Sequence, residues 1–234
     1  MSKITKNDFL AGQLLLIDKP LNWSSFQAVN ALKWAIRKQF DLKKIKIGHA
    51  GTLDPLATGL LIICTGKFTK RIPELQGQIK EYTGTITLGG TTPSYDLETT
   101  IDKTFAVDHI TDELIQKTIQ QFIGPIAQKP PIFSALKKDG KRLYEFARAG
   151  QEVEIKSRSV EIFEFKISKI NLPVLEFRVV CSKGTYIRSL AHDFGKALGS
   201  GGHLSSLRRT KIGSYNVNNA VTPDVFKEKL LPDS

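Results

Sequence analysis

The sequence has few cysteines, few histidines and no long hydrophobic run. Its 234 residues include two cysteines and four histidines. Cys64 and Cys181 both lie in apolar segments, where a small buried thiol is expected rather than a disulfide framework. The N-terminal region has only four consecutive aliphatic residues, at 14–17, too few for a signal-peptide core or a membrane span. We therefore expect a soluble cytoplasmic protein.

Several catalytic classes lack their characteristic residues. The histidines, at positions 49, 109, 192 and 203, show no close ligand spacing, and no Cys-x-x-Cys occurs, which disfavours zinc sites and zinc-dependent base deamination. No glycine-rich segment ends in Gly-Lys-Ser/Thr, as a phosphate-binding loop would. Two-metal nuclease chemistry would need clustered carboxylates within the basic regions. The sequence thus predicts no metal.

Positive charge is plentiful and its distribution is uneven. Lysine and arginine number 34 and aspartate and glutamate 23, for a net charge of +11, which favours a polyanionic partner such as nucleic acid over an unspecialised basic protein. Between Asp41 and Glu74 the only acidic residue is Asp54, in the segment GHAGTLDPLATG. What remains is chemistry by a single carboxylate on a basic surface.

Hydrophobic periodicity predicts an α+β fold with a mixed, largely antiparallel sheet flanked by helices. We expect strands near 13–17, 59–65, 79–89, 158–170 and 173–181, and helices near 25–40, 111–123 and 185–198. The first helix is expected to repeat Phe26, Val29, Leu32, Ile36 and Phe40 along its apolar face, and the second to turn Leu114, Ile115, Ile119, Phe122 and Ile123 inward. Residues 173–181 should place Leu175, Phe177, Val179 and Cys181 on one face.

Two charged residues stand out as candidates for a site. Asp54 precedes a proline and is surrounded by glycines, so it is either a turn cap or a reactive carboxylate approached closely by a substrate. Arg188, in CSKGTYIRSLAHDFG, is the best candidate for a cation that keeps Asp54 ionised. The alternative is an ordinary surface arginine.

Residues 128–150 combine cations with aromatic rings. Phosphates and unpaired bases of RNA suit this combination, whereas the alternative is a solvated helix with a buried aromatic stripe. The cations are Lys129, Lys137, Lys138, Lys141, Arg142 and Arg148.

Four separated segments resemble the TruB family of pseudouridine synthases. They are Asp18-Lys19-Pro20 with Ser24-Ser25, the segment 48–59, the Lys-Pro-Pro-x-x-Ser-Ala-Leu-Lys run at 129–137, and Cys181–Arg188. The resemblance implies a pseudouridine synthase fold with residues 128–150 as an RNA-binding thumb. It also implies isomerisation of uridine 55 in the T loop of tRNA after the base is flipped out, without metal or organic cofactor.

The resemblance also implies roles for individual residues. Asp54 would be the catalytic aspartate, Arg188 its partner and Tyr82 the ring that stacks on the target base. His49, Lys19 and Tyr186 would complete the substrate pocket. Arg208 and Arg209 are expected to join the thumb cations in binding RNA.

Three departures from the family pattern carry expectations of their own. Asn22 replaces a glycine and must tolerate a left-handed backbone. No glycine follows Asp96, which leaves its binding role open. No C-terminal PUA-type domain is expected, so residues 1–234 should form one catalytic domain that acts as a monomer. An RNA-binding or tRNA-folding module with secondary catalysis is the competing hypothesis.

Overall fold

The structure of the protein is a computed structural model, and it describes residues 4–134, 136–138, 140–151 and 153–230. The chain divides into two compact units, unit 1 with Met1–Tyr82 and Arg208–Ser234, and unit 2 with Thr83–Leu207. Both boundaries fall inside strands, β4 (Lys80–Leu88) and β12 (Gly202–Ile212). The expectation of a single catalytic domain stays a prediction.

Unit 1 contains a sheet in which β3 lies between β1 and β12, with β2 also pairing with β3 and β13 with β12. β1 and β3 are antiparallel, from Leu14 opposite Cys64 to Lys19 opposite Gly59. That register brings Lys19 to the end of β3 that follows the Asp54 turn. The elements are α1 (Lys6–Ala11), β1 (Leu14–Lys19), α2 (Ser25–Gln39), β2 (Ile47–His49), β3 (Ala57–Thr65), η1 (Gly66–Arg71), α3 (Ile72–Gly77), β13 (Tyr215–Asn216), η3 (Val217–Asn219) and α7 (Pro223–Leu230).

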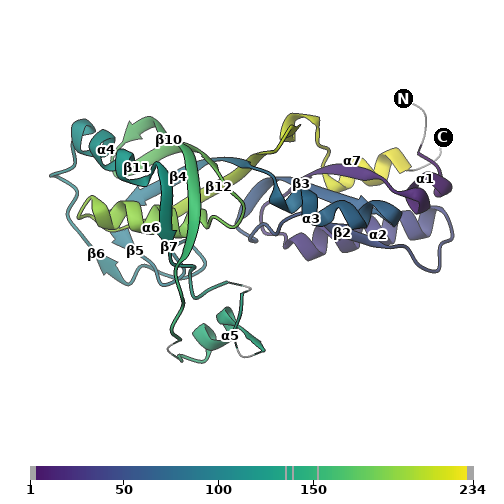
Figure 1. Cartoon of the computed structure of the whole chain (residues 1–234), viewed down its shortest axis with the longest axis horizontal. Coiled ribbons are helices and arrows are strands. Elements are labelled where there is room, and N and C mark those ends of the chain that lie inside the picture. The colour runs from purple at the N-terminus through teal and green to yellow at the C-terminus, as the bar shows by residue number, and fades with distance from the viewer. Residues whose placement is uncertain (1–3, 135, 139, 152, 231–234) are drawn as a thin grey trace. The chain divides into compact units, whose positions relative to one another are not determined.

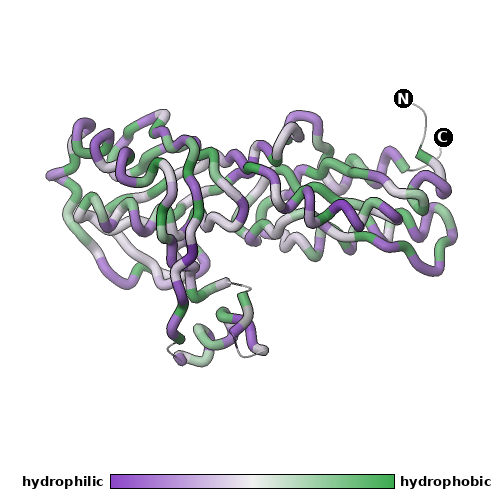
Figure 2. The backbone as a smooth tube through the Cα atoms, viewed as in Figure 1, coloured by the Kyte–Doolittle hydropathy of each residue, from purple (hydrophilic) through white to green (hydrophobic). Residues whose placement is uncertain are grey.

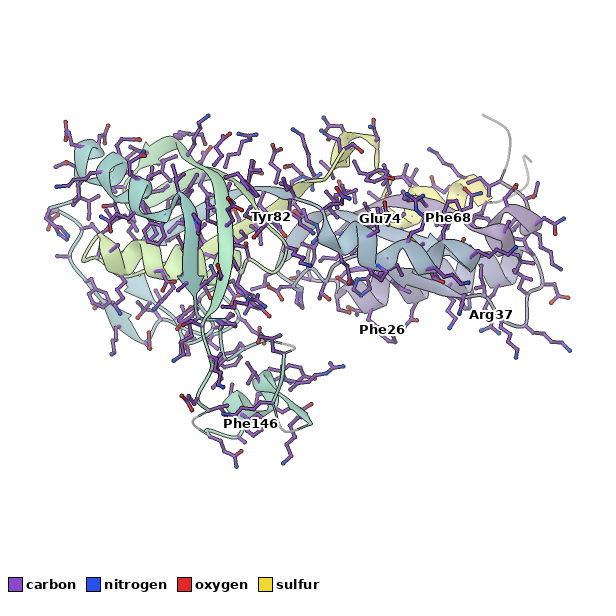
Figure 3. The ribbon with its side chains drawn as sticks, viewed as in Figure 1. Phe26, Arg37, Phe68, Glu74, Tyr82 and Phe146 are labelled. Carbon is purple, nitrogen blue, oxygen red and sulfur yellow. The ribbon has the colours of Figure 1, made fainter. Side chains whose placement is uncertain are left out.

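Helix α2 begins at a reciprocal cap. The Ser24 hydroxyl accepts from the Gln27 amide at 3.1 Å, and the Gln27 side chain accepts from the Ser24 amide at 2.7 Å, an arrangement that satisfies two otherwise unpaired donors. Val29, Leu32 and Ile36 are buried against residues of β1 and β3. The expectation for Phe26 is wrong, because its side chain is 69% exposed (Figure 3).

Unit 2 is built on antiparallel strands. β10 lies between β11 and β7, and β4 lies beside β11; β10 runs opposite β7 from Arg158–Gln128 to Ile162–Gly124. Two small two-stranded sheets pair β5 with β6 and β8 with β9. The elements are β5 (Gly90–Thr91), β6 (Lys103–Thr104), α4 (Asp112–Ile119), η2 (Gln120–Phe122), β7 (Gly124–Gln128), β8 (Lys137–Lys138), β9 (Lys141–Arg142), α5 (Leu143–Arg148), β10 (Arg158–Asn171), β11 (Val174–Cys181) and α6 (Ile187–Ala197).

Aromatic rings fill the interior of unit 2. The Phe165 ring lies 5.2 Å from that of Phe194 on α6 and 6.3 Å from that of Phe177 on β11, both edge to face, a favourable geometry for aromatic pairs. The four residues predicted to share one face of β11 are all buried. Ile123, predicted to point inward, is 41% exposed, because the α-helix ends at Ile119 and a 3-10 turn replaces its last residues.

The thumb, residues 128–150, leaves the sheet of unit 2 between β7 and β10. It carries the β8–β9 hairpin and α5, which Figure 1 shows extending away from the strands of this unit. Figure 2 shows hydrophilic and hydrophobic residues interleaved along it. Leu143 is its buried anchor, 3% exposed, and the Tyr144 amide donates to the Ser134 carbonyl at 3.1 Å.

The predicted α+β class with a mixed sheet and flanking helices is confirmed. The strand ladders within each unit are antiparallel, and isolated parallel bridges join Ile17 to Val221 and Asp96 to Leu204. Within the described ranges, no helix is both long and apolar enough to cross a membrane.

Candidate functional site

The turn that carries Asp54 is fixed by hydrogen bonds on both of its sides, and those on the Ser25 side are buried. The Ser25 hydroxyl accepts from the Leu53 amide at 2.8 Å and donates to the Leu53 carbonyl at 3.0 Å. On the other side, the Asn22 amide donates to the Pro55 carbonyl at 2.9 Å. Asn22 has φ 64, so the expected left-handed backbone is confirmed. Asp54 is therefore a half-buried carboxylate on an ordered turn.

Arg209 supports the same turn from β12. Its side chain is 1% exposed, its Nε donates to the Leu60 carbonyl at 2.8 Å, and its Nη2 donates to the Gly51 carbonyl at 3.0 Å. The backbone of β12 also approaches closely, because a Cβ on Gly59 would lie 2.3 Å from the Arg209 carbonyl oxygen. This burial argues against the expected phosphate contact and gives Arg209 a positioning role.

Lys19 is a cation of unit 1 whose charge interacts with that of Asp54. Its side chain is fully buried, and its Nζ donates to the carbonyls of Trp23 at 2.5 Å and Pro20 at 2.9 Å. Burial lowers the pKa of Lys19 to about 8, while the negative charge of Asp54 raises this pKa and the positive charge of Arg209 lowers it. At neutral pH the ammonium is retained and favours ionised Asp54.

His49 and Tyr82 are the other two residues of unit 1 that were expected to form the substrate pocket. His49 is the last residue of β2 and is half-buried. Burial, with a smaller contribution from the charge of Arg209, lowers the pKa of His49, so the neutral imidazole is favoured at physiological pH. Tyr82 is 8% exposed on β4. Its stacking on a target base stays a prediction.

Arg188 is buried in unit 2, so the surface-arginine alternative is wrong. Its side chain is 4% exposed, and its Nε lies 3.6 Å from Oδ2 of Asp96, itself 7% exposed. Its Nη1 donates to the Phe133 carbonyl at 2.9 Å. Asp96, whose role the sequence left open, therefore helps to orient Arg188. The pairing of Arg188 with Asp54 joins residues of the two units and stays a prediction.

Tyr186 precedes α6 and is held through its backbone. The Gln128 side chain accepts from the Tyr186 amide at 2.7 Å and donates to the Tyr186 carbonyl at 3.0 Å. The Arg158 guanidinium lies 4.5 Å above the Tyr186 ring, a cation–π geometry. Gln128 is fully buried, so the base of the thumb fixes the position of Tyr186.

The cations expected to bind RNA differ in how they are engaged. Lys129, Lys141, Arg142 and Arg148 are exposed, and the Lys138 ammonium donates to the Glu154 carbonyl at 2.9 Å. The Lys137 side chain lies outside the described part of the structure. Arg142 and Arg148 flank the Tyr144 ring, at 5.8 and 5.2 Å from its centroid. In unit 1, Arg208 is half-buried and binds Asp18 through two hydrogen bonds, of 2.6 and 3.0 Å.

Sequence reasoning missed three supporting residues. The sequence named Ser25 only as part of a family motif and Gln128 only as the first residue of a basic segment. It left the binding role of Asp96 open. Each acts through a contact with a segment distant in sequence, which local patterns do not report. Among the residues described, no group of three or more His, Cys, Asp or Glu side chains is arranged to hold a metal ion.

Comparison with known proteins places this arrangement in a family. Residues 37–187 match the model of the TruB family pseudouridylate synthase N-terminal domain, and residues 188–232 match the tRNA pseudouridylate synthase B C-terminal domain. A Flavobacterium johnsoniae protein named tRNA pseudouridine synthase B is 67% identical over 97% of this chain and 100% of its own length. A Parabacteroides distasonis protein of the same name is 54% identical, over 95% of each chain.

A solved structure titled as a Cbf5-Nop10-Gar1 complex has a similar fold. The match has a TM-score of 0.68 and 26% identity, and it covers 96% of this chain and 60% of the solved chain. With the two family models, this match confirms the predicted pseudouridine synthase fold. The chain belongs to the TruB family of pseudouridylate synthases, and it is an isomerase.

Proposed function

We propose that this chain converts uridine 55 in the T loop of tRNA to pseudouridine, with Asp54 as the catalytic group. The names of its relatives support tRNA as the substrate. The observation that carries the catalytic assignment is the Asp54 turn. A carboxylate on a turn that Ser25 and Arg209 fix through buried bonds has the preorganisation expected of a reacting group rather than of a turn cap.

The reaction is an isomerisation, so no atom has to be supplied. The bond between N1 of the uracil and C1′ of the ribose breaks, and a bond between C5 and C1′ forms, while C5 loses a proton and N1 gains one. An ionised Asp54 can begin this in two ways, by attacking the sugar or by removing a sugar proton so that the base detaches. Both routes need the carboxylate in its charged form when substrate excludes water.

The two cations proposed as partners of Asp54 would meet this requirement. The ammonium of Lys19 interacts with the carboxylate in unit 1. Arg188 is the proposed second partner, oriented by Asp96. An opposite charge within a few ångströms lowers the pKa of a carboxylate, so this pair would keep Asp54 ionised in a closed site.

Access to the target uridine requires that the base leave its stack. Unstacking costs a few kcal/mol, which contacts to phosphates and to the flipped base must offset. We assign the base stack to Tyr82, the other pocket contacts to His49 and Tyr186, and phosphate contacts to the thumb cations with Arg208. Exposed cations beside aromatic rings suit a single-stranded loop.

The proposal includes a monomeric enzyme that acts on the T arm of cytoplasmic tRNA without metal or organic cofactor. A secondary role in binding and folding tRNA agrees with the net charge of +11. The competing hypothesis, an RNA-binding module without significant catalysis, differs in one measurable respect: such a module would bind tRNA and leave uridine 55 unmodified.

The decisive experiment compares Asp54→Asn with Asp18→Asn on unmodified tRNA. We expect Asp54→Asn to lower the rate of pseudouridine formation by about 10⁴-fold, the upper range for loss of a reacting group, with tRNA affinity unchanged within about twofold. Asp18→Asn, which removes another carboxylate of unit 1, should retain most of the activity. Full activity in Asp54→Asn would refute the site, and a wild-type protein that binds tRNA but forms no pseudouridine would refute the enzyme.

A further inference from the structure

Unit 1 has a hollow lined by lysines at the end of β3 opposite to the Asp54 turn. Its volume is about 560 Å³, and we call it the lysine pocket. The lining comes from α1, from the loop between α2 and β2, and from η1. Its residues are Leu10, Lys44, Ile45, Lys46, Gly66, Lys67, Thr69 and Lys70.

The floor of the lysine pocket is rigid. The Gly66 amide donates to the Lys46 carbonyl at 2.9 Å, and the Thr69 hydroxyl donates to the Gly66 carbonyl at 2.8 Å. Gly66 has φ 51, and a Cβ there would lie 2.2 Å from the Leu10 carbonyl oxygen. Ile45 is 7% exposed. The backbone that carries the lysines is therefore held in place before any ligand arrives.

The charge of the lysine pocket is not neutralised by the protein. Its four lysines are exposed, and none of them forms an ion pair with any residue that the structure describes. The nearest arginine in sequence, Arg71, forms an ion pair with Glu74, with its Nε 3.4 Å from the Glu74 Oε2. Lysine stems can line an apolar floor while their ammonium groups remain in water. Like charges held together in this way repel one another, so a ligand with several negative charges would relieve the repulsion.

The distance between the lysine pocket and the Asp54 turn limits which phosphates of a bound RNA could reach the pocket. β3 runs from Ala57, next to the Asp54 turn, to Thr65, next to Gly66. Eight residue steps at about 3.3 Å each span about 26 Å. At the roughly 2.8 Å of axial rise per base pair in an A-form RNA helix, this equals about nine base pairs. A phosphate bound in the lysine pocket is therefore too far away to belong to the flipped nucleotide or to its immediate neighbours.

We propose that the lysine pocket binds backbone phosphates of the tRNA helix that continues from the T loop, about nine base pairs from the target base. This inference rests on the proposed function, since it takes tRNA as the substrate. The recognised chemistry is the phosphodiester backbone, so the contact adds affinity without sequence preference. Unit 1 would then contact the tRNA helix as well as the T loop.

The test compares two RNAs and two variants with equal loss of charge. The RNAs are full-length tRNA and a T-arm hairpin of about five base pairs, roughly 14 Å long and therefore too short to reach the pocket. The pocket variant carries Lys44→Gln, Lys46→Gln, Lys67→Gln and Lys70→Gln. The control variant carries Lys103→Gln, Lys117→Gln, Lys166→Gln and Lys169→Gln, all exposed positions of unit 2.

For full-length tRNA, we expect the pocket variant to raise Kd about tenfold. The slope of log K against log salt should become shallower by about one unit for each lost phosphate contact. With the hairpin as substrate, the Kd and kcat of the pocket variant should match those of the wild type within about twofold. The control variant should bind both RNAs like the wild type. If the four changes prevent folding, the pair Lys67→Glu and Lys70→Glu on η1 is measured in the same way.

Three results would overturn the inference. They are an unchanged Kd for full-length tRNA, an equal loss with the hairpin, and an equal loss in the control variant, which would indicate a general effect of net charge. An acidic protein or a free anion as the true ligand would produce the first result. Failure of the proposed function looks different, because the wild type would then form no pseudouridine on either RNA, whatever the binding data.

Discussion

The Asp54 turn of unit 1 and the thumb of unit 2 are both proposed to contact the tRNA, but they are held differently. Buried side chains bond the backbone of the turn and of the strand that follows it, at Leu53, Leu60 and Gly51. The thumb is anchored mainly by Leu143 and by backbone bonds, and most of its cations are exposed. This difference in support matches the different requirements of catalysis and of phosphate binding. A reacting carboxylate needs a fixed position, whereas phosphate contacts tolerate exposed and adaptable side chains.

The largest expected effect comes from breaking the support of the turn at Arg209. Arg209→Met leaves the carbonyls of Leu60 and Gly51 without this donor, and each unsatisfied buried acceptor costs about 1–3 kcal/mol. We expect the free energy of unfolding to fall by about 3 kcal/mol and pseudouridine formation to fall with it. Urea unfolding measures the first effect and a tRNA modification assay the second.

Arg208→Met is the matched control for stability. Arg208 binds Asp18 in a half-exposed pair, and such pairs contribute about 0–1 kcal/mol. If the two variants unfold at the same urea concentration, the claim that buried bonds distinguish the turn is wrong.

The contrast between Arg208 and Arg209 also shows where sequence reasoning stops. Both were expected to bind RNA because charge patterns do not distinguish a buried guanidinium from an exposed one. The five strands and three helices given by periodicity were predictable because that pattern is local, whereas β12 was not predicted. The exposure of Phe26 was not predictable. Ser25 occupies the buried position in the first turn of α2, where its hydroxyl forms hydrogen bonds with Leu53. A tertiary contact at the site thus overrides the apolar pattern of the helix.

Ser25 provides a sharper test of the turn. Ser25→Ala removes both hydrogen bonds to Leu53, at about 1 kcal/mol each, so we expect the free energy of unfolding to fall by about 2 kcal/mol and kcat to fall about tenfold. Ser24→Ala removes only the cap of α2, which costs about 1 kcal/mol, and should leave kcat unchanged. Equal kcat values in the two variants would show that Ser25 matters for the helix rather than for Asp54.

Substitutions in the thumb should change the affinity for tRNA and not the catalytic rate. The triple change Lys141→Ala, Arg142→Ala and Arg148→Ala should raise the Kd for tRNA about tenfold and flatten its salt dependence, while kcat at saturating tRNA stays within about twofold of the wild type. Lys103→Ala, Lys117→Ala and Lys166→Ala provide the control. An unchanged salt slope in the thumb variant would place the thumb outside the RNA interface.

A further prediction concerns the pH dependence that Lys19 contributes to the stability of the protein. Its pKa is about 8 in the folded protein and 10.5 at its ordinary value. Between these values the unfolded chain binds more protons than the folded one, so this contribution to stability rises with pH from about 8 to 10.5 and is lost as pH falls through 8. Urea unfolding of the wild type and of Lys19→Met across this range isolates it, because other groups titrate alike in both proteins. A stability difference that does not change between pH 8 and 10 would mean that Lys19 keeps its proton throughout, and that the Asp54 turn holds an ordinary ammonium.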